Sequence, residues 1–165
     1  IMSKRFNLRE FQQGLLDRMQ VQAQGASQVA TLGILIGQES WLVDMADISE
    51  VMSLPALTAV PLTKQWYCGV ANVRGNIYSI ADLGAYMNYG ITVYDAQSRV
   101  LLIGQKYNFN TGLLVSKVLG LRNSNDWQRS EEDGIVSYRD SSGQQWRKLD
   151  VRQLLQQPEF IQIGV

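Results

Sequence analysis

The sequence predicts an all-β protein with flanking helices, built from two β-barrels packed against each other. Short apolar runs recur at intervals of roughly ten residues and are punctuated by glycine, a pattern typical of barrels and sandwiches rather than of alternating βαβ units. Residues 100–103, Val-Leu-Leu-Ile, are apolar on both faces of the expected strand. A single open sheet with one hydrated side would not favour such a strand, whereas two packed barrels could share it.

Residues 1–28 predict a helical extension in front of the barrels. Asn7 and Glu10 have the spacing of a capping box, which marks the start of a helix. The apolar residues that follow recur every four positions and form one stripe on a helix over about 8–22: Phe11, Leu15 and Met19. This stripe could pack on the chain's own barrels or bind a partner, and the sequence leaves both open.

The remaining residues, 29–165, are expected to form the barrels. Strands are predicted, in order, at 31–37, 41–46, 48–52, 69–73, 76–80, 99–104, 112–119, 135–139 and 144–149. Pro55 and Pro61 bracket a connection that cannot lie inside a central strand. Asp82 and Asp150 can each cap a short helix, and Pro158 should end the second one. The acidic residues 131–133 are expected in an exposed loop.

The composition excludes most kinds of catalysis. The chain has no histidine, so it has no imidazole base, no Ser-His-Asp triad and no histidine-ligated metal. Its one cysteine, Cys68, cannot form an internal disulfide and is expected to be a small buried side chain. Lysine and arginine balance aspartate and glutamate at 15 each, which argues against nucleic-acid binding. We therefore expect no enzymatic activity, no cofactor and no metal.

The sequence also argues against insertion into a membrane. No apolar run follows the basic residues Lys4, Arg5 and Arg9, so a signal-peptide core is not expected. Residues 19–38 carry no charge, but their glutamines make them too polar to span a bilayer. We expect a cytoplasmic protein.

Charge is scarce in the middle of the chain. Residues 51–98 contain four charged side chains: Lys64, Arg74, Asp82 and Asp95. A block this poor in charge is either core or a surface that binds another protein. The sequence does not choose between these two interpretations.

An ordered series of motifs resembles the CheW-like domain family. The series begins with Ile48-Ser49-Glu50-Val51, continues through a proline-bearing loop to the Gly-Val-Ala-Asn-Val-Arg-Gly of residues 69–75, and ends in Asp82-Leu83. The resemblance covers about residues 29–157 and implies two SH3-like β-barrels. Within the family, residues 7–11, 41–44 and 116–123 are most similar to the adaptors of type IV pilus chemosensory systems. Ser79 departs from the proline usual after Arg-Gly, and the N-terminal helix is absent from the minimal domain.

The resemblance implies a non-catalytic adaptor. Such a protein would couple the hairpin tip of a methyl-accepting chemoreceptor to the regulatory domain of a CheA-type histidine kinase, in the signalling that controls twitching motility. It would be recruited to membrane-associated chemoreceptor arrays. Two alternatives stay open: a flagellar-type chemotaxis coupling protein and, in a different class, a β-barrel that binds single-stranded nucleic acid.

The resemblance also nominates residues for partner binding. They are Ile48 and Glu50 on the kinase-facing surface, Asn72 and Arg74 in the most specific part of the motif, and Leu83, Leu113 and Val115 in the groove between the barrels. From the residues alone, Ile48 could equally be ordinary core. Glu50 and Arg74 could form an internal ion pair that fixes two strands.

Overall fold

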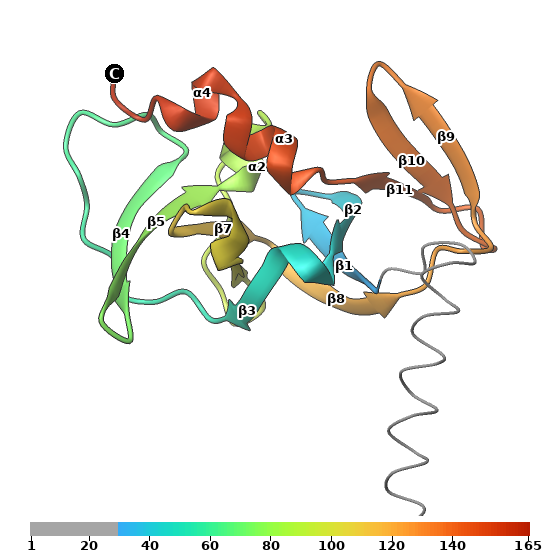
Figure 1. Cartoon of the computed structure of the whole chain (residues 1–165), viewed down its shortest axis with the longest axis horizontal. Helices are drawn as coiled ribbons and strands as arrows, with labels where there is room; N and C mark the ends of the chain where they lie inside the picture. Colours follow the sequence, from blue (N-terminus) through green and yellow to red (C-terminus); the bar gives the residue numbers. More distant parts are fainter. Residues whose placement is uncertain (1–29) are drawn as a thin grey trace, which may run out of the picture.

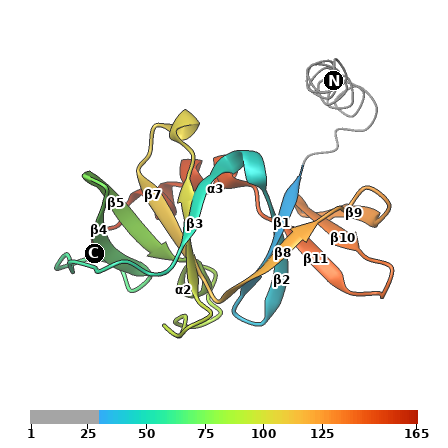
Figure 2. The same cartoon turned by 90° about the horizontal axis from the view of Figure 1, so that it is seen from below.

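The structure is a computed structural model, and it describes residues 30–165. These residues form two curved β-sheets that lie side by side, each rolled into a small barrel (Figures 1 and 2). The prediction of an all-β fold with two packed barrels and flanking helices is confirmed. The predicted N-terminal extension, including its helix over 8–22, lies outside the described residues.

The first barrel is a six-stranded sheet in the order β8-β1-β2-β11-β10-β9. Its strands are β1 (Thr31–Ile36), β2 (Glu39–Asp44), β8 (Lys117–Arg122), β9 (Gln128–Glu132), β10 (Ile135–Arg139) and β11 (Gln145–Lys148). Neighbouring strands are antiparallel except β11 and β2, which run parallel.

The second barrel is a five-stranded sheet in the order β3-β6-β7-β5-β4. Its strands are β3 (Ile48–Met52), β4 (Tyr67–Val73), β5 (Asn76–Asp82), β6 (Arg99–Ile103) and β7 (Thr111–Val115). The pair β5 and β7 is parallel, and the other pairs are antiparallel.

The chain crosses between the barrels at two short connections. A 3₁₀ turn over Met45–Asp47 leads from β2 to β3, and Ser116 alone separates β7 from β8. The predicted single strand over 112–119 is therefore wrong, because its two halves belong to different sheets. Ser116 donates its backbone N–H to the carbonyl of Leu35 at 2.9 Å, which fixes the point where the chain changes barrel.

The expectation of a loop at residues 131–133 is also wrong. Glu131 and Glu132 belong to β9, whose five residues are all exposed and pair with β10. Asp133 and Gly134 form the turn, both with positive φ. Two consecutive residues with positive φ suit the right-handed twist of a hairpin, and Asp-Gly is a preferred pair for it.

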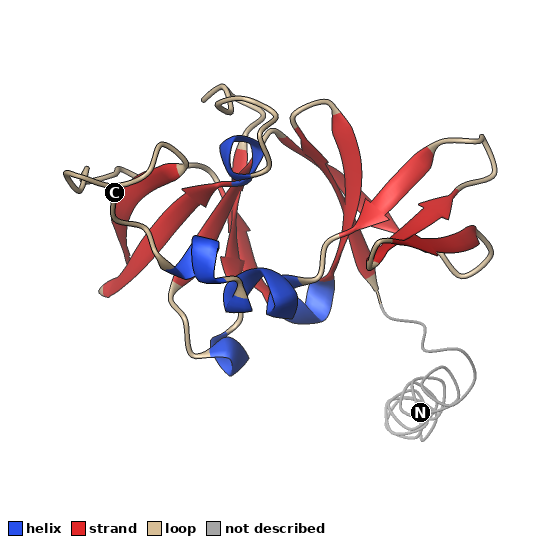
Figure 3. Cartoon of the chain, turned by 90° about the horizontal axis from the view of Figure 1, so that it is seen from above, coloured by secondary structure: helices blue, strands red, loops and turns tan. Residues whose placement is uncertain are grey.

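Within residues 30–165 three α-helices accompany the strands: α2 (Leu83–Tyr86), α3 (Val151–Gln156) and α4 (Pro158–Ile161). As predicted, Asp82 and Asp150 cap α2 and α3, each accepting a backbone hydrogen bond. Helix α3 ends just before Pro158, but Pro158 also begins α4, which the sequence did not predict. Figure 3 shows the helices gathered mostly around the junction of the two barrels.

Two apolar cores result from this arrangement. The shared core lies between the barrels and combines residues of β1, β2, β6 and β7 with α3 and Phe160 of α4. The inner core lies within the second barrel. Strand β6 serves both, because Leu101 and Ile103 face the shared core while Val100 and Leu102 face the inner core. The two-faced strand predicted from the sequence is confirmed.

Among residues 30–165, no helix has the length and hydropathy needed to cross a bilayer.

Candidate functional site

The Asn-x-Arg-Gly motif is, locally, a hairpin turn. Arg74 and Gly75 are the two turn residues between β4 and β5, with φ of 51° and 87°. Such a turn needs positive φ at both positions, which glycine adopts freely and arginine does not. Asn72 supports the turn because its Oδ1 accepts the backbone N–H of Gly75 at 2.9 Å. The motif therefore fixes the backbone position from which the Arg74 side chain extends.

Arg74 reaches from this turn to Glu50 on β3. Both guanidinium nitrogens Nη1 and Nη2 pair with the carboxylate, with Nη1 3.3 Å from Oε2. Strands β3 and β4 are the two outermost strands of the second sheet, so the pair closes the seam between its two edges. The hydrogen bond from Arg74 lowers the pKa of Glu50, and the same bond raises the pKa of Arg74.

The Glu50–Arg74 pair remains accessible to solvent. The side chain of Arg74 is 69% exposed and that of Glu50 is 34% exposed. Exposed ion pairs contribute little to stability, because water screens both charges. The structure thus brings the two predicted residues together as an ion pair between strands and leaves that pair where another protein could contact it.

Exposed apolar side chains lie close to this pair along the chain, on β3 and β5. Val51, which follows Glu50, is 37% exposed, and Ile77, the register partner of Asn72, is 53% exposed. Sequence reasoning did not select either residue. The signal for Ile77 was the alternation in β5, because Tyr78 and Ile80 face inward and Ile77 must then face outward. Glu50 is the register partner of Leu102 and Val51 that of Leu101, so these two side chains point to opposite sides of β3. We call Glu50, Val51, Asn72, Arg74 and Ile77, the residues around the seam, the seam surface.

The other predicted site residues belong to the core rather than to a surface. Leu83, Leu113 and Val115 are each 0% exposed and lie in the shared core. They do lie between the barrels, as expected, and a partner could touch them only if the barrels separated. Ile48 is half-buried and packs against the same core.

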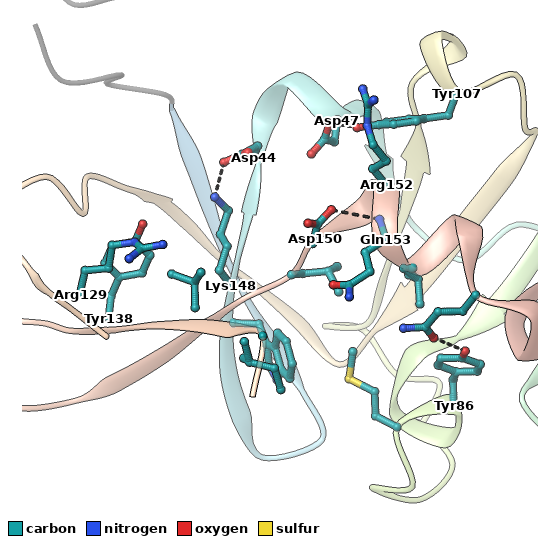
Figure 4. A pocket seen from close by; sticks show the side chains of 18 residues that line it. Asp44, Asp47, Tyr86, Tyr107, Arg129, Tyr138, Lys148, Asp150, Arg152 and Gln153 are labelled. Atoms are coloured by element: carbon teal, nitrogen blue, oxygen red, sulfur yellow. Dashed lines mark hydrogen bonds and ion pairs between the residues drawn. The ribbon is translucent and has the colours of Figure 1, made fainter. Parts of the chain in front are cut away.

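A cleft of about 600 Å³ lies at the junction of the barrels, beside α3 (Figure 4). Figure 4 shows Arg129 and Tyr138 on one side and Tyr86 on the other, with Asp150 between them. The carboxylates of the cleft are already engaged. Lys148 Nζ lies 2.8 Å from Asp44 Oδ1, and Lys106 Nζ lies 3.0 Å from Asp47 Oδ1.

Among the described residues, no group of three histidine, cysteine, aspartate or glutamate side chains could hold a metal ion. Cys68 is half-buried and lies 3.5 Å from the hydroxyl of Tyr94. Burial raises the pKa of the Cys68 thiol, which keeps it protonated and weakly nucleophilic at neutral pH.

Comparison with known proteins gives a consistent result. The family model of the CheW-like domain matches residues 30–159. Protein PilI of Pseudomonas aeruginosa is 32% identical over 91 residues, which are 55% of this chain and 51% of PilI. The chain thus spans about half the length of that relative. The chemotaxis protein CheW of Thermotoga maritima is 24% identical over 103 residues, 62% of this chain and 67% of that protein.

A solved structure supports the fold. The scaffolding protein TtCheW from Thermoanaerobacter tengcongensis superposes with a TM-score of 0.67 at 17% sequence identity. The alignment covers 79% of this chain and 94% of the other. The two-barrel arrangement is therefore shared with a protein whose sequence has largely diverged.

Proposed function

Because the chain belongs to the CheW-like domain family, we propose that it is a non-catalytic adaptor that couples a chemoreceptor to a CheA-type histidine kinase. The likeness to PilI supports a role in type IV pilus signalling and twitching motility. The name of the Thermoanaerobacter tengcongensis relative, a scaffolding protein, supports a role without catalysis. In this proposal the protein works in the cytoplasm, at receptor arrays held by the membrane.

The seam surface is the observation that carries this proposal. It combines one exposed, doubly hydrogen-bonded ion pair with exposed apolar side chains, in a part of the chain that has few other charges. Protein–protein interfaces combine apolar contact area with a few charged side chains that form oriented hydrogen bonds, and arginine is enriched among these side chains. We assign Glu50 and Arg74 to contact with the kinase or the receptor.

Coupling needs a body that passes a change in one partner to the other. The shared core joins the two barrels through β1, β2, β6 and β7, so they form one packed unit. If the receptor and the kinase occupy different parts of this unit, the adaptor stabilises one geometry of the complex over another. A change in the receptor then shifts the activity of the kinase without any chemistry in the adaptor.

The substitution Arg74→Glu tests the proposal. It places two carboxylates at the seam, so we expect affinity for the kinase or the receptor to fall at least tenfold, measured by isothermal titration. Circular dichroism should stay near that of the native protein, because the pair is exposed. Arg129→Glu is the matched control, since Arg129 is 55% exposed on the other barrel. Normal binding of both partners by the Arg74→Glu variant would contradict the proposal.

A charge swap separates the two roles of the pair. The double variant Glu50→Arg, Arg74→Glu restores an ion pair across the seam but reverses the charges that a partner meets. We expect binding to stay weak in this variant. Full recovery would mean that the pair acts only by holding the two strands together.

The runner-up is a flagellar-type coupling protein, which the likeness to the Thermotoga maritima chemotaxis protein favours. Both candidates would bind a kinase and a receptor. Co-purification from cells that contain both systems distinguishes them, because each candidate should retain the kinase of its own pathway.

A further inference from the structure

The cleft at the junction of the barrels has the dimensions of a binding site. Its volume of about 600 Å³ falls within the range of ~300–1,000 Å³ common for ligand clefts. Its lining includes the apolar side chains of Trp41, Met87, Leu149 and Leu154. At its edge Ile135 is 44% exposed, an apolar side chain left largely in water.

The lining also contains an unsatisfied hydrogen-bond donor. Trp41 is 6% exposed, and its indole Nε1 has no acceptor within the described residues. A buried N–H without a partner costs free energy, so most proteins provide one. The Nε1 atom is itself shielded from solvent, so the apolar side chains of the lining are what an occupant with apolar side chains would complement.

Residues 1–29 join the described structure at the edge of the same cleft. The carbonyl of Ala30 accepts the backbone N–H of Met45 at 3.0 Å, and Thr31 is the register partner of Asp44. Asp44 lines the cleft. Residues 23–29 could span up to about 25 Å when extended, so a helix over 8–22 can reach the cleft from this point.

That helix needs a surface to be stable. A helix of about 15 residues is marginal alone in water, and Gly14 in its interior weakens it further. Its stripe of Phe11, Leu15 and Met19 has the four-residue spacing by which amphipathic helices anchor in grooves. A short linker also gives this segment a high effective concentration at the cleft, which favours it over a separate partner.

We propose that the helix predicted over residues 8–22 docks in this cleft within the same chain, with Phe11, Leu15 and Met19 against Trp41, Met87 and Ile135. The cleft is lined from both barrels, by Tyr138 of the first and Tyr107 beside the second. The docked helix therefore bridges the barrels and restrains their relative orientation. This inference goes beyond the adaptor function and does not depend on it.

Photo-crosslinking of the full chain tests this docking. Benzoylphenylalanine replaces Leu15 in one variant and Gln13 in the matched control, which lies about 160° away around a helix. After irradiation of dilute protein, mass spectrometry identifies the crosslinked peptides. We expect the probe at Leu15 to label residues 134–138 or 148–157 of the same chain, at least fivefold more than the probe at Gln13. Equal labelling from both positions, or crosslinks only between chains, would overturn the proposal.

A substitution in the cleft gives a second test. Ile135→Arg puts a charge where the stripe would pack, and the exposure of Ile135 lets the barrels tolerate it. Crosslinking from position 15 to the cleft should fall at least fivefold, while crosslinking in the control Ile91→Arg, which is 61% exposed in the native chain, should not change. Unchanged crosslinking in Ile135→Arg would also overturn the proposal. Neither readout involves a kinase or a receptor, so failure of the adaptor proposal would leave these results standing.

Discussion

The carboxylate of Asp140 organises the turn between β10 and β11. Its Oδ1 accepts from the backbone N–H and hydroxyl of Ser142 at 2.9 and 2.7 Å and from the N–H of Gln144 at 2.9 Å. Its Oδ2 accepts the indole N–H of Trp146 at 3.0 Å. These bonds favour the charged form, and the one from Trp146 has the largest effect in lowering the pKa of Asp140 to about 2.

Asp140→Asn should therefore destabilise the protein in a way that depends on pH. The ordinary pKa of 3.8 is higher than the folded value of about 2. The contribution of the charged carboxylate is thus complete above pH 4 and is lost as the pH falls toward 2. Urea unfolding followed by tryptophan fluorescence should show a difference between wild type and variant at pH 7 that shrinks below pH 4. A difference that stays constant down to pH 2 would contradict this explanation.

At the scale of single residues, the sequence predicted the ion pair better than its surroundings. Glu50 and Arg74 could be selected because the motif order is specific and opposite charges can form an ion pair between two strands. The burial of Leu83, Leu113 and Val115 could not be predicted, because an apolar residue near a junction gives the same sequence pattern whether it faces a groove or a core. Only the packing of the two barrels decides between these environments, and that packing is not a local property.

Among the elements, α2 depends on Asp82 more than a helix usually depends on its cap. Asp82 is 2% exposed and accepts the N–H of Ala85 at 3.2 Å. It also accepts the backbone N–H of Thr92 at 2.8 Å and the Thr92 hydroxyl. One buried carboxylate thus holds both the start of α2 and the loop that follows the helix.

Asp82→Ala should cost more stability than the corresponding change at the other capping aspartate. Removing Asp82 leaves buried donors without an acceptor, at about 1–3 kcal/mol for each unsatisfied group. Asp150→Ala removes one exposed capping bond to Gln153 and should cost about 1 kcal/mol. Urea unfolding at pH 7 measures both differences. Equal losses in the two variants would show that the bonds to Thr92 contribute nothing.

The elements that the sequence missed have physical reasons. Strand β9 has no buried residue, so it lacks the alternation by which strands are recognised. The Asp133-Gly134 turn was the signal that could have revealed it, because this pair favours hairpins. The break at Ser116 is marked only by the polar pair Ser116-Lys117, because apolar residues end at Val115 and resume at Val118.

At the scale of the whole molecule, the two barrels could be predicted from β6, whose faces are both apolar and serve the two cores. The parallel pairing of β5 with β7 and of β11 with β2 could not be predicted from the sequence. Such pairings join strands far apart in the sequence, and no turn specifies their register. They follow from how the barrels close, which is decided by the complete set of strands.

The shared core should make the stability of the barrels interdependent. Leu113 is fully buried in it, so Leu113→Ala should lower the free energy of unfolding by about 2–5 kcal/mol. Because this core contacts both sheets, we expect amide hydrogen exchange to accelerate in β2 of the first barrel and in β5 of the second by similar factors. Mass spectrometry of peptides from the two strands measures this.

Leu114→Ala is the matched control, because Leu114 is the next residue of β7, is equally buried and faces only the inner core. Removing the Leu114 side chain should accelerate amide exchange in β5 more than in β2, because the cavity that the substitution creates lies within the second barrel. Faster exchange confined to β5 in Leu113→Ala as well would mean that the barrels open separately. The proposed coupling requires the two barrels to respond together through the shared core, so this comparison also tests the physical basis of that proposal.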